Sequence, residues 1–128
     1  MEIVRSTPNE LGFFKRLGEW MEEQEDRLWI ITPFIDKIGI GLVNSSSKAK
    51  SCRMICRRNK ELPNVKSMIR IRMHENVHVK LFVGDSEAMF GSVNLTQNSL
   101  TDNMEMMMKF KEKEVVEKVA KYFEVLWV

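Results

Sequence analysis

Four apolar segments of strand length follow one another in the second half of the sequence, and they constrain the fold more than any other feature. They comprise residues 67–73, 77–85, 87–95 and 103–111. Valine, isoleucine, phenylalanine and methionine predominate in them, and turn-forming residues separate the middle segments. A succession of this kind predicts several strands of one sheet.

The first half of the sequence mixes helical and strand patterns. Residues 6–24 predict a helix, in which Thr7 caps the N-terminus, Pro8 occupies the first turn and Glu10 completes a capping box. Residues 36–46 predict a second helix that opens at the acidic residue of "DKIGIG", although its two glycines disfavour helix.

Two further strands and a last helix complete the pattern. Residues 27–35 are almost continuously apolar and predict a buried strand, and residues 50–58 predict another. Residues 113–128 carry apolar side chains on one face and Glu/Lys pairs on the other, which is typical of a surface helix. We therefore expect one α/β domain, residues 1–128, with a mixed β-sheet flanked by helices on both faces.

Composition limits the setting of the protein. The 128 residues are 44% hydrophobic and carry a net charge of +2, so the charge of the whole chain does not predict a polyanionic partner. Two cysteines, Cys52 and Cys56, are too few for a disulfide framework and indicate a reducing compartment. We see neither a secretory signal nor an apolar run of about 20 residues. The expectation is a cytoplasmic protein without stable membrane association.

Polar residues at alternate positions interrupt the apolar strands. His78 and Lys80 are two apart, so both project from one face, about 7 Å apart along the strand. The same alternation predicts that Val77, Val79, Leu81 and Val83 point into a core. Ser92 and Asn94 share a face of the next segment, and Glu105 stands alone among methionines. A carboxylate in such a strand needs a partner, for which a histidine N–H is suitable.

These residues form a recognisable pattern. "HVKLFVGD" at 78–85 has the form H-x-K-x4-D, and "GSVN" at 91–94 has the form G-S-x-N. The pattern resembles the phospholipase D superfamily, in a single-motif, nuclease-like form. "LWIITPFID" at 28–36 is similar to the early strand of that family, and Glu105 resembles its acidic residue downstream of the motif.

The resemblance implies a phospholipase D-like fold and a catalytic set. His78 would be the nucleophile that forms a phosphohistidine, Lys80 and Asn94 would bind phosphate, and Glu105 would orient His78. Ser92 would assist on the substrate side. Asp85, at the end of the strand, would give structural support without touching substrate. No metal and no cofactor are implied, because the protein supplies the cations.

A second catalytic histidine is required, and the chain has a single motif. The resemblance therefore implies a homodimer in which His78 of each chain meets at a two-fold axis. The expected function is an endonuclease, a metal-independent phosphodiesterase with DNA or RNA as substrate. The alternatives are a phospholipase or cardiolipin-type hydrolase that uses the same residues, and a non-catalytic nucleic-acid-binding module of a larger assembly.

Two further patterns could indicate a metal site or a nucleic-acid groove. Cys52, Cys56, His74 and His78 form the ligand set of many zinc sites, but four-residue spacing in strands separates each pair by about 13 Å. We therefore expect ordinary buried thiols. The basic run at 57–60, with Lys48 and Lys50 before it, fits either a groove for nucleic-acid phosphates or a solvated surface.

Overall fold

The computed structural model describes residues 1–6 and 12–128. Its elements in chain order are β1 (Glu2–Arg5), α1 (Phe14–Glu22), β2 (Arg27–Ile31), α2 (Lys37–Ser46), β3 (Ser51–Cys56), the short helix η1 (Leu62–Asn64), β4 (Ile69–Met73), β5 (Leu81–Val83), β6 (Ala88–Gly91), the π-helical turn η2 (Asn98–Asp102), β7 (Met106–Phe110) and α3 (Lys113–Trp127). The predicted cap at Thr7, Pro8 and Glu10 lies outside the described residues.

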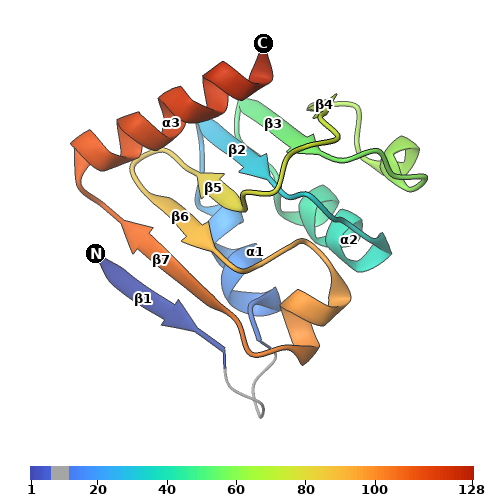
Figure 1. Cartoon of the computed structure of the whole chain (residues 1–128), viewed down its shortest axis with the longest axis horizontal. Helices are drawn as coiled ribbons and strands as arrows, with labels where there is room; N and C mark the ends of the chain where they lie inside the picture. Colours follow the sequence, from blue (N-terminus) through green and yellow to red (C-terminus); the bar gives the residue numbers. More distant parts are fainter. Residues whose placement is uncertain (7–11) are drawn as a thin grey trace.

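Seven strands of the described part of the chain form one sheet in the order β1-β7-β6-β5-β2-β3-β4 (Figure 1). β2, β3 and β4 run parallel to one another. The pairs β2–β5, β5–β6, β6–β7 and β7–β1 are antiparallel. The sheet is therefore mixed, as the sequence predicts.

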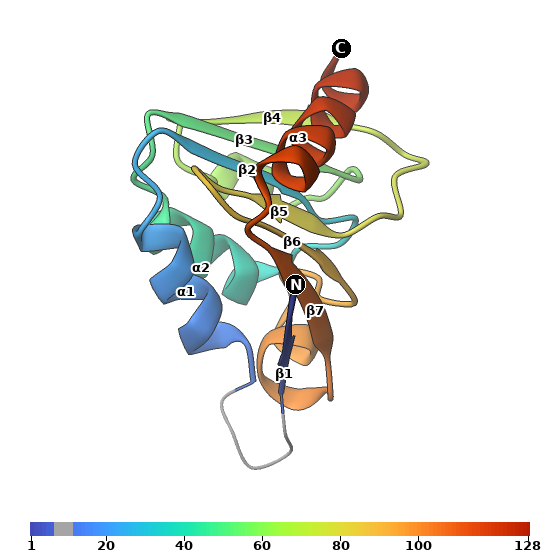
Figure 2. The ribbon, with the colours of Figure 1, turned by 90° about the vertical axis from the view of Figure 1, so that its left-hand side faces the viewer.

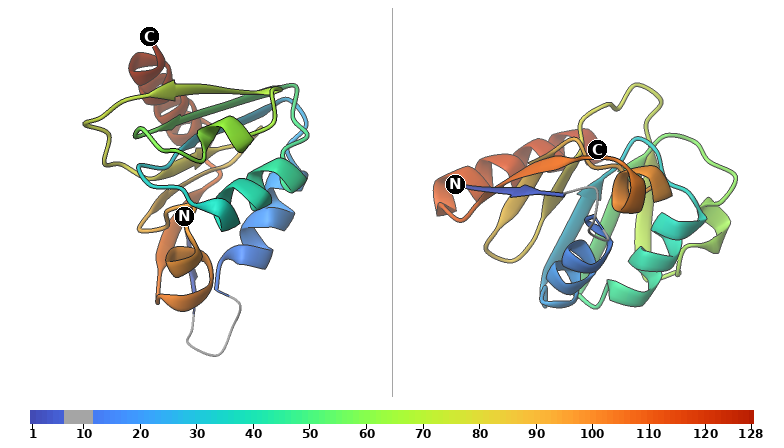
Figure 3. Two further views of the ribbon diagram at one scale, coloured as in Figure 1. Left: turned by 90° about the vertical axis from the view of Figure 1, so that its right-hand side faces the viewer. Right: turned by 90° about the horizontal axis from the view of Figure 1, so that it is seen from below.

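Helices cover both faces of this sheet. α1 and α2 lie together on one face, and α3 crosses the other (Figures 2 and 3). Along β2, Leu28 and Ile30 belong to the core beneath α1 and α2, whereas Trp29 and Ile31 belong to the core beneath α3. This strand is apolar on both faces because both faces are covered. The predicted fold class is confirmed.

One of the two glycines of α2, Gly39, has a packing explanation. The side chain of Asp36 caps the helix by accepting a hydrogen bond from the Gly39 N–H at 3.1 Å. A Cβ atom on Gly39 would overlap the carbonyl oxygen of Leu95. Glycine therefore lets α2 approach the segment after β6, which outweighs its low helix propensity.

Two strand predictions need correction. β5 comprises only Leu81–Val83, so residues 77–80 form an extended loop ahead of the strand. Strict alternation fails there: Val77 and Leu81 are buried, but Val79 is 37% exposed. β1 was not predicted, and it adds an antiparallel edge strand beside β7. Its short sequence, Glu-Ile-Val-Arg, has too little apolar pattern to be recognised.

The tails of two strands meet beyond the start of β5. The β2–β5 pairing extends to Ile31 opposite Leu81. Farther along, Ile35 forms a parallel bridge with Leu95, although β5 separates β2 from β6 within the sheet. Thr32 reinforces this junction because its hydroxyl accepts a hydrogen bond from the Leu95 N–H at 3.0 Å. The segment 77–80 thus lies outside the strand that it leads into.

Candidate active site

The polar residues of the motif gather where several strands end. β2, β3 and β6 end, and β5 begins, on the same side of the sheet, because β5 is antiparallel to β2 and β6. We call this side the rim. It carries Phe34 after β2, Arg57 after β3, His78 and Lys80 before β5, and Asn94 after β6.

His78 is exposed on the loop that enters β5, and Lys80 is half-buried. The ammonium group of Lys80 donates to the carbonyl of His78 at 3.2 Å. The carbonyl of Lys80 accepts from the Gly91 N–H at 3.3 Å, which holds the two parts of the motif side by side. An exposed imidazole beside a cation is able to meet an anionic ligand from solvent.

Asn94 contacts the loop after β2. Its side-chain oxygen accepts a hydrogen bond from the Phe34 N–H at 3.3 Å. With its oxygen engaged, the Asn94 amide presents N–H donors, and these are the groups that a phosphate oxygen needs. The structure thus brings Asn94 to the same rim as His78 and Lys80.

Ser92 is held by β7. Its hydroxyl donates to the Met106 carbonyl at 3.2 Å and accepts from the Met106 N–H at 3.0 Å. A substrate phosphate offers only acceptors, so Ser92 must release the Met106 carbonyl before its proton can reach phosphate. In the single chain its contacts support the start of β7.

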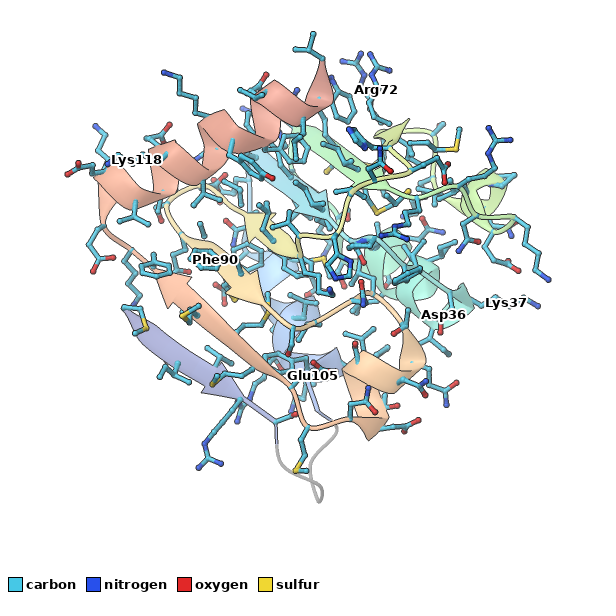
Figure 4. The ribbon with its side chains drawn as sticks, in the orientation of Figure 1. Asp36, Lys37, Arg72, Phe90, Glu105 and Lys118 are labelled. Carbon is cyan, nitrogen blue, oxygen red and sulfur yellow. The ribbon has the colours of Figure 1, made fainter. Side chains whose placement is uncertain are left out.

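Glu105 is half-buried just before β7, and Figure 4 labels it together with Asp36 at the start of α2. Its carboxylate accepts from the Ser99 hydroxyl and from the Asn103 side chain, each at 3.3 Å. No hydrogen bond between the described residues joins Glu105 to His78. The orienting role of Glu105 stays a prediction.

Ser99 is a buried link that was not predicted from the sequence. Its hydroxyl accepts from the backbone N–H of Asn94 at 3.2 Å while it donates to Glu105. The carboxylate is therefore connected through one side chain to the Asn94 backbone. The signal in the sequence is weak, because serine in "QNSL" after a strand is typical of a turn.

Asp85 lies at the opposite end of the strands from the rim. Its carboxylate accepts backbone N–H bonds from Glu25 (2.7 Å), Asp26 (2.9 Å) and Arg27 (2.8 Å). Burial acts to raise the pKa of Asp85, but these three bonds and the charge of Arg27 outweigh it, so the pKa lies below its usual value. Asp85 thereby braces the turn before β2.

The basic residues divide between the two ends of β3. Arg57, Arg58 and Lys60 follow the strand, whereas Lys50 precedes it and pairs with Asp26 at 3.6 Å. A six-residue strand separates these ends by about 20 Å. Lys48 and Lys50 therefore lie at the end of β3 opposite the rim, and of the basic residues in this part of the sequence only those after β3 lie at the rim.

Arg57 and Phe34 are rim residues that no sequence pattern connects. The Arg57 guanidinium lies 5.0 Å from the centre of the Phe34 ring. Its Nε atom donates to the carbonyl of Val77 at 2.9 Å, directly before His78. Phe34 is 47% exposed. The two residues lie 23 positions apart, and only the folded chain brings them together.

Both cysteines are buried and unpaired. Burial raises the pKa of the Cys56 thiol to about 11, with Glu75 adding to the effect. Since thiolates are the form that binds metals, this environment disfavours ligation. In the described part of the chain, no three His, Cys, Asp or Glu side chains are grouped as a metal site.

A surface cavity of about 560 Å³ lies away from the rim, between α1 and the strands β1, β6 and β7. Glu87 in its wall accepts from the Trp20 indole at 3.0 Å and lies 3.9 Å from Lys109 and 3.7 Å from Lys111. These three charged groups thus have partners within the chain.

The fold is similar to that of known proteins. The structure is similar to NucT from Helicobacter pylori (TM-score 0.70, 16% identity, covering 96% of this chain and 94% of NucT). It is also similar to Nuc from Salmonella typhimurium, a phospholipase D family member (TM-score 0.71, 12% identity, 98% and 93%). At these identities the likeness shows the fold.

A third similar structure is TrmBL2, an archaeal chromatin protein with a novel mode of DNA binding (TM-score 0.62, 18% identity). The match covers 98% of this chain and 51% of TrmBL2, so the chain spans about half the length of that protein. No curated protein has a matching sequence. Of the helices in the described residues, none has the length and apolar character to cross a membrane.

The sequence itself matches the family model described as "Cardiolipin synthase, PLD-like domain" over residues 19–127. That range contains the motif at 78–85, the G-S-x-N at 91–94 and the acidic residue at 105. The chain therefore belongs to the phospholipase D superfamily, with a PLD-like domain of the cardiolipin synthase type.

Proposed function

We propose that this protein is a metal-independent phosphodiesterase, an endonuclease that hydrolyses DNA or RNA at a homodimer interface. The observation that carries the proposal is the exposed His78 beside Lys80 and Asn94 on the rim. It combines a nucleophile with donors for the phosphate oxygens, which is the set that metal-free phosphoryl transfer requires.

The chemistry has two balanced steps. An unprotonated ring nitrogen of His78 attacks phosphorus, a P–N bond forms, and the P–O bond to the leaving oxygen breaks while His78 of the partner subunit protonates that oxygen. That second imidazole then takes a proton from water. The water oxygen attacks phosphorus, and the P–N bond breaks.

The other rim residues have supporting roles in this proposal. Lys80 and Asn94 donate to the non-bridging oxygens, where charge must be stabilised in the transition state. Glu105 orients an imidazole, and its side chain must turn from Ser99 and Asn103 to do so. Ser92 assists by fixing the segment between Gly91 and Asn94 against β7.

The test uses both histidines of the chain. His78→Asn abolishes cleavage of single-stranded and duplex oligonucleotides, and cleavage by the wild type persists in excess chelator. His74→Asn is the matched control, because His74 lies in the same loop, outside the motif, and its Nδ1 atom accepts from the Asn76 N–H at 3.3 Å. If His78→Asn still cleaves the oligonucleotides, His78 is not the nucleophile. If chelator abolishes cleavage by the wild type, the reaction depends on a metal.

Subunit mixing tests the shared site. If each site needs His78 from two chains, an equal mixture of wild type and His78→Asn after subunit exchange retains about a quarter of the wild-type activity. Sites complete within one chain would retain about half. Light scattering that finds only monomers in an active sample contradicts the dimer.

A phospholipase activity is the second candidate, since the matched family description names a cardiolipin synthase. It uses the same catalytic residues. Hydrolysis of cardiolipin vesicles without cleavage of oligonucleotides reverses the ranking. Tight oligonucleotide binding without turnover instead favours a binding module, for which the similarity to the chromatin protein TrmBL2 is the supporting observation.

A further inference from the structure

Phe34 is an exposed aromatic side chain on a tightly held backbone. Its neighbours Pro33 and Ile35 are buried, but the Phe34 ring is not. The Phe34 N–H donates to Asn94, and its carbonyl accepts from the Thr32 hydroxyl at 2.6 Å. The Ile35 backbone bridges to Leu95. The backbone that carries the ring is therefore fixed at the rim, and the side chain is open to solvent.

Arg57 connects this ring to the catalytic segment. Its guanidinium stacks on Phe34, and its Nε atom is bonded to the carbonyl immediately before His78. Among residues 1–6 and 12–128, Arg57 has no carboxylate at ion-pair distance. Its terminal N–H groups are thus available to an external anion.

A nucleotide carries both an anion for Arg57 and a flat aromatic ring for Phe34. Its phosphate offers oxygens to Arg57, and its base offers a flat π-face to Phe34. A base within a duplex is already stacked and paired, so it cannot lie on Phe34 without leaving the helix. A phospholipid headgroup has no aromatic ring to stack there.

We infer that Phe34 and Arg57 form a nucleotide-binding subsite beside His78 that takes one unpaired base, so that single-stranded nucleic acid is the preferred substrate. The inference rests on the proposed function. In this arrangement the base stacks on Phe34, and Arg57 contacts a phosphate next to the one that His78 attacks.

Charge favours a nucleic acid over a protein at this position. Lys37 and Lys60 are exposed near the ends of the same loops, and Asp36 is engaged by the Gly39 and Gln97 N–H groups. Arg58 pairs with Glu75 at 3.9 Å. Covering Phe34 with a second protein would bury the Arg57 charge without a counterion from this chain, which is costly.

The experiment scans single-stranded oligonucleotides with one abasic position. An abasic site at one position near the scissile phosphate weakens binding and raises KM of the wild type about tenfold, as loss of one stacked base does. In Phe34→Ala every oligonucleotide of the series behaves alike, and Phe34→Trp restores the dependence. Tyr122→Ala on α3 is the control, because Tyr122 is equally exposed at 47%.

Arg57→Met provides an independent readout. It lowers the slope of log affinity against log salt by about 0.7 for single-stranded DNA, as loss of one phosphate contact does. Binding is measured in a His78→Asn background, so it does not depend on turnover.

The possible failures are distinguishable. If cleavage is absent but the abasic position still matters for binding, the endonuclease proposal fails and the subsite stands. If His78 is essential but Phe34→Ala leaves the abasic dependence intact, the subsite is wrong. Dissociation of the dimer in Phe34→Ala identifies the partner subunit as the occupant and likewise overturns the inference.

Discussion

Arg53 and Arg57 lie four residues apart and both stack on aromatic rings, yet their surroundings are opposite. The Arg53 guanidinium lies 3.9 Å from the centre of Trp29 and 5.0 Å from that of Trp127, and it forms an ion pair with Glu124 of α3. Arg57 stacks on the exposed Phe34 and binds a backbone carbonyl.

The difference separates a structural arginine from an available one. Arg53 is largely enclosed, its charge is neutralised, and its partners come from β2 and α3. It therefore ties α3 to the sheet. Arg57 keeps an unbalanced charge at the rim. Stacking on an aromatic ring is common to both, so the counterion and the exposure of the ring decide which arginine can bind a ligand.

The largest expected effect concerns the ring at the centre of the α3 interface. Phe123 is fully buried and stacks on Trp29 with ring centres 5.2 Å apart. Phe123→Ala lowers the free energy of unfolding by about 3–5 kcal/mol through the cavity it leaves. Phe34→Ala changes it by no more than about 0.5 kcal/mol. Urea unfolding curves of both variants measure these free energies. Equal losses would mean that the exposed ring of Phe34 supports the fold as much as the buried ring of Phe123 does.

A smaller effect compares the two arginines directly. Arg53→Met lowers the free energy of unfolding by about 1–3 kcal/mol, because it removes a largely desolvated cation–π contact and the ion pair with Glu124. Arg57→Met lowers it by about 0.5–1.5 kcal/mol, because it removes the hydrogen bond to the Val77 carbonyl, and it also weakens oligonucleotide binding. The free energy of unfolding and the affinity for an oligonucleotide are measured for both variants. If Arg53→Met lowers only the affinity, Arg53 does not have the structural role described above.

The smallest expected effect is on the thermal stability of a variant at Asp85, whose carboxylate binds three backbone N–H groups of the same chain. Its folded-state pKa is lowered, so its contribution to stability is present above the unfolded pKa of about 3.9 and is lost as pH falls through the folded value. Asp85→Asn therefore lowers Tm most at neutral pH, and the difference shrinks below about pH 4.

The control for this pH dependence is Asp102→Asn. Asp102 is exposed, and its side chain accepts a hydrogen bond from the Thr101 hydroxyl. Thermal unfolding from pH 3 to 7 is the measurement. A Tm difference for Asp85→Asn that is independent of pH contradicts an ionised, backbone-bound carboxylate.

Strong periodic patterns made most of the fold predictable. The apolar run at 27–35 and the amphipathic run at 113–128 became β2 and α3. Where tertiary contacts prevail, the sequence was less informative. The helix at 36–46 formed in spite of its glycines, because Leu95 lies against Gly39, whereas β1 was missed because it forms on the free edge of β7. Neither partner is visible in the local sequence.

The candidate site divides in the same way. The spacing of His78 and Lys80 predicts that they act together, and Gly91 hydrogen-bonds to Lys80 as neighbouring segments should. Arg57 and Phe34 carry no comparable spacing signal. Ser99 links Asn94 to Glu105 through hydrogen bonds that depend on how η2 folds back. Arg57, Phe34 and Ser99 can therefore be recognised as site residues only from their contacts in the folded chain, because no sequence motif contains them.

The bridge between Ile35 and Leu95 has a consequence for adaptation. Because the tails of β2 and β6 join each other ahead of β5, the histidine-bearing segment lies outside the ladder of β5, and it is held at its two ends while His78 and Val79 between them are exposed. Amino-acid changes in that segment can alter reactivity while the scaffold keeps its strength. A fold with this feature is able to acquire new substrates at little cost in folding.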